Sequence, residues 1–176
     1  MKRLSSFFAV SFTLVLLLAT TAQAATSGTA TVTLAASANT MIQILDAAIT
    51  LTPTATDYAN DFVDAAGASG LRVRVKTNSS GGLQLKVKCG DASPQIALSD
   101  LLVKTATAPG GAGSSLTSYT PVSAADLDLW TSTVSQHAWL TVTTDIRVQN
   151  IASYDDPIGG GTTDYTNTLT YTVVAQ

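Results

Sequence analysis

The sequence contains one cysteine, one histidine, no glutamate and few charged residues of either sign. All twelve acidic residues are aspartates, and charged residues make up 12% of the chain. A single cysteine excludes an intramolecular disulfide, and one cysteine with one histidine is too few for a typical zinc site. Without glutamate, and with many threonines and serines, the chain is a poor helix former and a good strand former. Helical bundles, coiled coils, Rossmann folds and globally basic nucleic-acid-binding proteins are therefore excluded.

Long hydrophobic runs are also missing, apart from a short one near the N-terminus. Two positive charges, Lys2 and Arg3, precede an apolar stretch that ends in the small-residue sequence Ala22-Gln23-Ala24. This pattern predicts a secretory signal at residues 1–24, because the apolar run is shorter than the roughly 20 residues of a membrane span. We expect an exported protein, extracellular, at the cell surface or periplasmic, with no transmembrane anchor. Residues 25–176 hold seven cations and twelve aspartates, a net charge of −5.

Several segments after residue 40 alternate apolar and polar residues with the two-residue period of half-buried strands. These segments cover residues 41–45, 49–52, 71–76, 83–89, 139–148 and 166–174. One more alternating segment precedes them, at residues 29–34. One helical turn is expected within residues 123–130. About seven or more short strands predict one antiparallel, immunoglobulin-like β-sandwich domain over residues 25–176, with a small barrel as the alternative.

The sequence offers little for catalysis. The single histidine, His137, has no nucleophile nearby in sequence, and no Gly-x-Ser-x-Gly motif is present. A glycosidase needs two carboxylates across a cleft, and nothing in the sequence pairs the aspartates. We therefore expect no enzyme activity and no organic cofactor.

Calcium is the metal ion for which the sequence contains candidate ligands. Asp57, Asp61 and Asp64 lie close together in a polar stretch, and Asp155-Asp156 lies in another. Carboxylates on loops are typical calcium ligands, but the spacing does not match an EF-hand. Acidic loops on an acidic exported protein are usually only solvated.

The most unusual feature is a concentration of positive charge. If residues 71–76 and 83–89 form a hairpin around the loop at residues 78–82, Arg72 lies opposite Lys88 and Arg74 opposite Lys86. With Lys76, these residues place five of the seven cations on one face, although like charges opposite each other are destabilising. One interpretation is a solvated edge protected against aggregation. The other is a docking surface for an acidic partner, such as another subunit.

Residues 159–173, from Gly159-Gly160-Gly161 through Tyr165 to a Thr-alternating strand, resemble the final turn and strand of bacterial exported β-sandwich proteins. These are fimbrial-type subunits and spore-coat-U-like proteins, and residues 71–88 are similar to the middle of such domains. The resemblance implies a structural subunit of an extracellular fibre, coat or surface layer that associates with itself or other surface proteins. Chaperone–usher pilins commonly have a cysteine pair and a C-terminal aromatic residue, and this chain has neither.

In an assembly of such subunits, the predicted strand that contains Thr29, Val32 and Leu34 has one of two roles. It is either the first strand of its own sandwich or a strand donated to the open sheet edge of a neighbour, with residues 35–39 as a hinge. An alternative function is an exported carbohydrate- or ligand-binding module with Trp130 or Trp139 as a stacking platform, although the pattern favours the core for Trp139. Cys89 follows the apolar alternation and is expected in the core, with an intermolecular disulfide as the alternative.

Overall fold

The structure is a computed structural model that describes residues 31–107, 113–154 and 164–176. The predicted signal at residues 1–24 and the acidic pair Asp155-Asp156 lie outside the described residues. The chain divides into two units, residues 1–35 and residues 36–176. In the first unit, residues 31–35 form no helix or strand, so the strand predicted over residues 29–34 is not found at residues 31–34.

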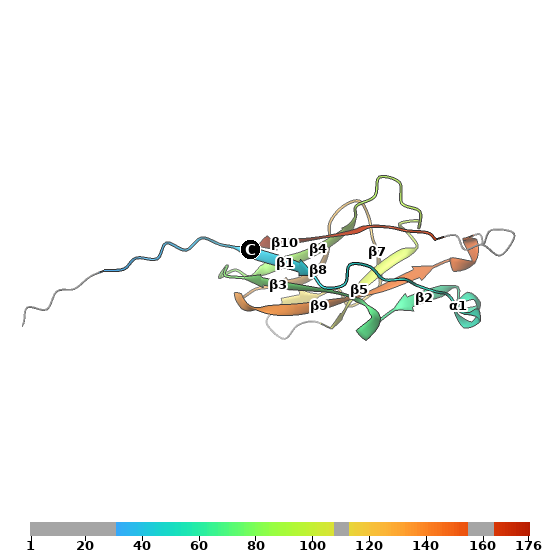
Figure 1. The fold of residues 1–176 in the computed structure, drawn as a ribbon, viewed down its shortest axis with the longest axis horizontal. Coiled ribbons are helices and arrows are strands. Elements are labelled where there is room, and N and C mark those ends of the chain that lie inside the picture. The colour runs from blue at the N-terminus through green and yellow to red at the C-terminus, as the bar shows by residue number, and fades with distance from the viewer. Residues whose placement is uncertain (1–30, 108–112, 155–163) are drawn as a thin grey trace, which may run out of the picture. The chain divides into compact units, whose positions relative to one another are not determined.

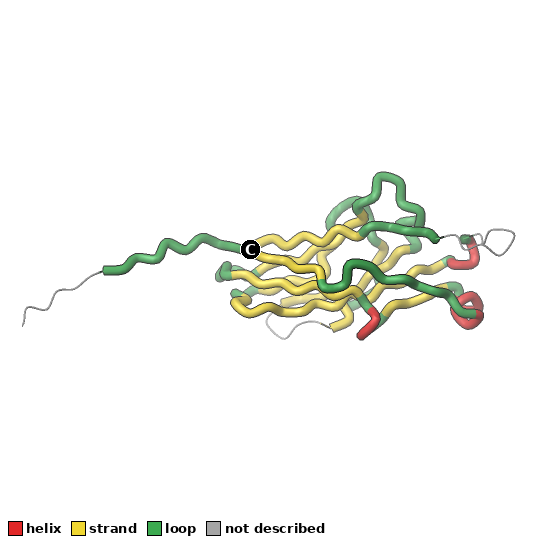
Figure 2. Tube along the Cα trace, in the orientation of Figure 1, coloured by secondary structure: helices red, strands yellow, loops and turns green. Residues whose placement is uncertain are grey.

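The second unit is an antiparallel β-sandwich of two sheets (Figures 1 and 2). One sheet has six strands, in the order β1-β3-β9-β5-β7, with β2 also pairing with β9. Its strands are β1 (Thr40–Ile44), β2 (Phe62–Ala65), β3 (Leu71–Thr77), β5 (Leu101–Thr107), β7 (Thr120–Pro121) and β9 (Gln136–Gln149). The other sheet has the order β10-β4-β8-β6. Its strands are β4 (Leu83–Cys89), β6 (Gly113–Ser115), β8 (Leu127–Ser132) and β10 (Leu169–Ala175). The predicted all-β sandwich is confirmed, and its immunoglobulin-like character stays a prediction.

The core lies between the two sheets and follows from the two-residue alternation. Val73 and Val75 of β3 and Leu83, Leu85 and Val87 of β4 are all fully buried. Alternate positions on the same strands carry the basic side chains, which therefore point away from the core. Cys89 continues this alternation and is 5% exposed, as the sequence predicts.

The predicted hairpin of residues 71–76 and 83–89 is wrong. β3 pairs with β1 and β9 in the six-stranded sheet, whereas β4 pairs with β10 and β8 in the four-stranded sheet. The loop between them crosses from one sheet to the other. Gly82 makes this corner possible, because it has φ +89° and a Cβ atom there would lie 2.0 Å from the carbonyl oxygen of Ser132.

Short helices occur at different places from the one expected. α1 (Ala55–Asn60) begins at a capping box in which Thr54 and Asp57 bond each other's backbone. Two 3₁₀ turns, η1 (Gly67–Ser69) and η2 (Ile151–Ser153), connect strands. Residues 127–130, for which a helical turn was expected, lie in β8, and the strand predicted over residues 49–52 is not formed. Among the described residues, no helix has the length and apolar character needed to cross a membrane.

Candidate functional site

The five basic residues that sequence analysis places on one face belong to two different surfaces. Arg72, Arg74 and Lys76 lie on the outer face of the six-stranded sheet, and Lys86 and Lys88 lie on the outer face of the four-stranded sheet. The like-charge contacts predicted for Arg72 with Lys88 and Arg74 with Lys86 are therefore absent, since each pair belongs to different sheets. The prediction of a single basic docking face is therefore wrong, because the five cations form two separate groups.

Most of these cations have a carboxylate partner. The Nε atom of Arg72 lies 2.8 Å from Oδ2 of Asp46, and this bond holds the pKa of Asp46 below its usual value. The Nζ atoms of Lys86 and Lys88 lie 3.4 Å and 4.0 Å from carboxylate oxygens of Asp128 and Asp126. These are surface ion pairs of modest strength.

The three calcium candidates do not converge. The Asp57 carboxylate accepts bonds from Thr54, which lower its pKa. Asp61 accepts the backbone N–H of Ala152 at 3.0 Å. Asp64 forms a bidentate pair with Arg147, with both N···O distances 2.7 Å. Within residues 31–107, 113–154 and 164–176, no three His, Cys, Asp or Glu side chains group as metal ligands would.

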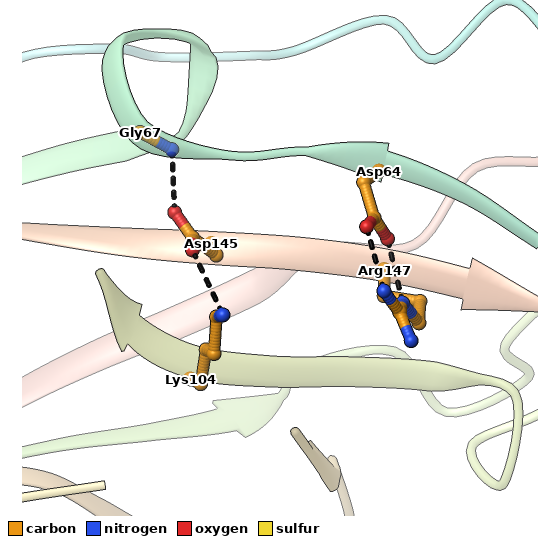
Figure 3. Close-up of polar contacts among 5 residues, drawn as sticks. All are labelled: Asp64, Gly67, Lys104, Asp145 and Arg147. Atoms are coloured by element: carbon orange, nitrogen blue, oxygen red, sulfur yellow. Dashed lines mark hydrogen bonds and ion pairs between the residues drawn. The ribbon is translucent and has the colours of Figure 1, made fainter. Parts of the chain in front are cut away.

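A cluster that sequence analysis missed lies on the outer face of the six-stranded sheet (Figure 3). Asp145 of β9 is only 4% exposed, because the η1 turn covers it. Its Oδ1 atom accepts the N–H of Gly67 at 2.7 Å, and its Oδ2 atom lies 3.5 Å from Nζ of Lys104. The Asp64–Arg147 pair lies beside it, and the bond to Asp64 raises the pKa of Arg147.

Two aromatic rings complete this cluster. The guanidinium carbon of Arg147 lies 4.0 Å from the ring centroid of Phe62 and 4.2 Å from that of Tyr119. The Tyr119 ring also faces Nζ of Lys104 at 4.5 Å, and burial raises the pKa of Tyr119. Every charge here is paired within the protein, so the cluster fixes β2, β5 and β9 together and leaves little capacity for a ligand.

A second cluster on the same face is built around Trp139. The ring of Trp139 lies 4.9 Å from the Arg74 guanidinium carbon and 4.8 Å from Nζ of Lys76. Trp139 is half-buried on the outer face rather than in the core, whereas Trp130 is 2% exposed and belongs to the core. The sequence expectation for Trp139 is therefore wrong, and Trp130 is not available as a stacking platform.

Beside this cluster lies a shallow depression of about 220 Å³, bordered by Asn39, Lys76, Gln136 and His137 among others. His137 is exposed at the start of β9. The nearby Asn78 side chain is occupied, because it accepts the N–H of Asn39 at 2.6 Å and donates to the carbonyl oxygen of Ser37 at 2.9 Å. The predicted hinge at residues 35–39 is thus held to the loop between β3 and β4 at two points.

The third candidate surface is the edge formed by β10. β10 pairs with β4 on one side, and no strand of the described residues pairs with its other side. β1, the edge strand of the other sheet, lies next to it (Figure 1). Leu169, Tyr171 and Val173 of β10 are half-buried against the core, and Val174 is 44% exposed.

The residues predicted to form a donated strand are placed only in part. Thr29 lies outside the described residues. Val32 and Leu34 are 93% and 87% exposed.

Searches for similar proteins found no matching family model, curated protein or solved structure.

Proposed function

We propose that this protein is an exported structural subunit of an extracellular fibre, coat or surface layer, joined by strand exchange. In this arrangement, residues 25–34 of one copy form a strand beside β10 of the next copy. The observation that carries the proposal is the open edge of β10. The resemblance of residues 159–173 to exported β-sandwich subunits supports the same class of function.

An open edge of this length has capacity for an added strand. β10 has seven residues, Leu169–Ala175, and alternate N–H and C=O groups along it point away from β4. A strand added there would gain main-chain hydrogen bonds and would cover Leu169, Tyr171 and Val173. Long edges with apolar side chains are usually covered or protected in stable proteins, so this edge is suited to a partner strand.

The N-terminal segment has the composition required of that strand. Ala30, Val32 and Leu34 alternate with Thr29, Thr31 and Thr33, which matches one apolar and one polar face. The described part of the segment, residues 31–34, forms no helix or strand. Pairing with a neighbour would bury Val32 and Leu34, and burying a Val or Leu side chain is worth about 1.5 to 3 kcal/mol.

The way in which this segment is joined to its own domain favours pairing with another copy. Asn78 binds the backbone of Ser37 and Asn39, so the segment leaves the sandwich from a fixed point. The chain before Ser37 therefore starts from a defined position beside the loop between β3 and β4. A defined starting point lowers the entropic cost of pairing with the next copy.

Deletion of residues 25–34 tests the proposal. The shortened protein should remain a folded monomer, should fail to form large assemblies, and should bind a synthetic peptide of residues 25–34. Circular dichroism, size-exclusion chromatography and peptide titration measure these three properties. A matched peptide with Val32 and Leu34 replaced by serine should not bind. An unfolded truncated protein that the peptide does not rescue would contradict strand donation.

A further inference from the structure

Among the described residues, two positively charged side chains have no carboxylate partner, and they lie together. The described residues contain seven cations, and five of them have a carboxylate oxygen within 4.0 Å. The other two, Arg74 and Lys76, have no such partner among the described residues. Both contact Trp139 on the outer face of the six-stranded sheet.

Comparison of the three arginines among the described residues shows what Arg74 lacks. Arg72 binds Asp46 through Nε and Nη2, and Arg147 binds Asp64 through the same two atoms. Arg74 also donates through Nε and Nη2, at 2.8 Å and 2.6 Å, but the acceptor is the neutral amide oxygen of Gln43. The amide oxygen therefore occupies the position that a carboxylate takes at the other two arginines.

The surroundings of Arg74 have groups suited to a sugar. Asn39, Gln136 and His137 border the adjacent depression of about 220 Å³, and the Nε2 atom of Gln136 already donates to Oγ of Ser132 at 3.0 Å. Amide side chains and a neutral imidazole can both donate and accept hydrogen bonds, as hydroxyl groups require. The depression is smaller than the roughly 300 to 1,000 Å³ of sites for drug-sized ligands, so it suits one sugar unit of a longer chain. Trp139 adds an apolar surface next to the two cations.

We propose that the surface formed by Gln43, Arg74, Lys76 and Trp139 binds a carboxylate-bearing sugar unit of an acidic polysaccharide. The sugar carboxylate replaces the Gln43 oxygen on the guanidinium of Arg74, and Lys76 adds a second positive charge. The guanidinium then pairs with an anionic carboxylate in place of a neutral amide oxygen, and arginine–carboxylate pairs are frequently bidentate, with two parallel N–H···O bonds. This site lies on the six-stranded sheet, whereas the assembly edge β10 belongs to the four-stranded sheet. The site would attach the subunit to an acidic polymer, and it does not depend on strand exchange.

Titration of the full-length protein with trigalacturonate tests the proposal, with neutral maltotriose and hexa-aspartate as comparison ligands. Calorimetry and tryptophan fluorescence report binding, and Trp139→Phe should remove the fluorescence change because Trp130 is buried. We expect binding of trigalacturonate that weakens with salt, and binding at least 10-fold weaker for both comparison ligands.

Three variants with the same change in net charge locate the site. Gln43→Glu supplies a carboxylate from the protein itself, so it should weaken binding at least 10-fold while the melting temperature stays equal or rises. Arg74→Gln should weaken binding by a similar factor. Lys88→Gln, on the outer face of the other sheet, should leave binding within 2-fold of the parent protein.

The proposal is overturned by unchanged affinity in Gln43→Glu, or by equal losses in all three variants, which would indicate non-specific charge attraction. Equal affinity for hexa-aspartate and trigalacturonate would also overturn it, because the surface would then recognise acidic peptides.

Discussion

Asp145 and Lys104 form an ion pair between β9 and β5 in which the carboxylate is almost fully buried and the ammonium is not. The side chain of Asp145 is 6% exposed and that of Lys104 is 30% exposed, with 3.5 Å between the charged atoms. The same carboxylate accepts the N–H of Gly67, which is 78 residues away in sequence. Asp145 therefore holds the η1 turn against the outer face of the six-stranded sheet.

Asp145→Ala should lower the free energy of unfolding by about 2 to 3 kcal/mol, because it leaves the Gly67 N–H and the Lys104 charge without their acceptor. Urea denaturation measures the change. Asp128→Ala removes a carboxylate that is 53% exposed, beside Lys86, and should cost less than about 1 kcal/mol. Equal losses in the two variants would mean that Asp145 does not have this structural role.

The buried hydroxyl of Tyr171 should make the folded protein less stable at alkaline pH. Burial raises the pKa of the Tyr171 hydroxyl to about 12, and the neighbouring Thr144 hydroxyl opposes part of this shift. Above pH 10 the unfolded state loses the Tyr171 proton while the folded state keeps it. The unfolded state then binds fewer protons, so stability falls between about pH 10 and pH 12. At about 1.4 kcal/mol per pH unit, this amounts to roughly 2 to 3 kcal/mol.

Tyr171→Phe is the control for this pH dependence. The Tyr171 hydroxyl is buried without a hydrogen-bond partner, so its removal should leave stability at pH 7 equal or slightly higher. Thermal denaturation from pH 7 to pH 12 should show a smaller alkaline loss in the variant. An identical pH profile in both proteins would contradict the assignment to Tyr171.

Gly82 determines that the chain crosses between sheets after β3. Gly82→Ala should destabilise the protein by more than about 1 kcal/mol, because φ is positive and the Ser132 carbonyl occupies the space of a Cβ atom. Gly67 also has positive φ, but nothing lies within 4 Å of its Cβ position, so Gly67→Ala should cost less. Chemical denaturation of both variants measures the difference, and a larger loss in Gly67→Ala would contradict this account.

The sequence predicts the class of fold correctly because alternation directly reports which side chains face a core. Val73, Val75, Leu85 and Val87 are buried as that pattern requires. Alternation does not report which strand is the neighbour, and a five-residue loop fits both a hairpin and a corner between sheets. One signal was available: Arg74 opposite Lys86 is an unfavourable pairing, and it indicated that β3 and β4 do not pair.

The candidate site is harder to predict because it depends on contacts between distant segments. Gln43 and Arg74 are 31 residues apart, and Asp64 and Arg147 are 83 apart. Only strand order brings these residues together, and alternation does not contain strand order. Trp139 illustrates the same limit, since an outward aromatic residue beside two cations has the same local pattern as a core residue.

Strand exchange at β10 is tested most directly by disulfide cross-linking between two copies. One protein carries Val32→Cys, the other carries a single cysteine at each position from 170 to 174 in turn, and Cys89 is replaced by alanine in both. We expect cross-linked dimers in the mixtures with a two-residue periodicity along β10, because alternate side chains of paired strands share one face. Neither protein alone should form that heterodimer. Absence of cross-linked dimers above the level of a mixture lacking the cysteine at position 32 would contradict the account.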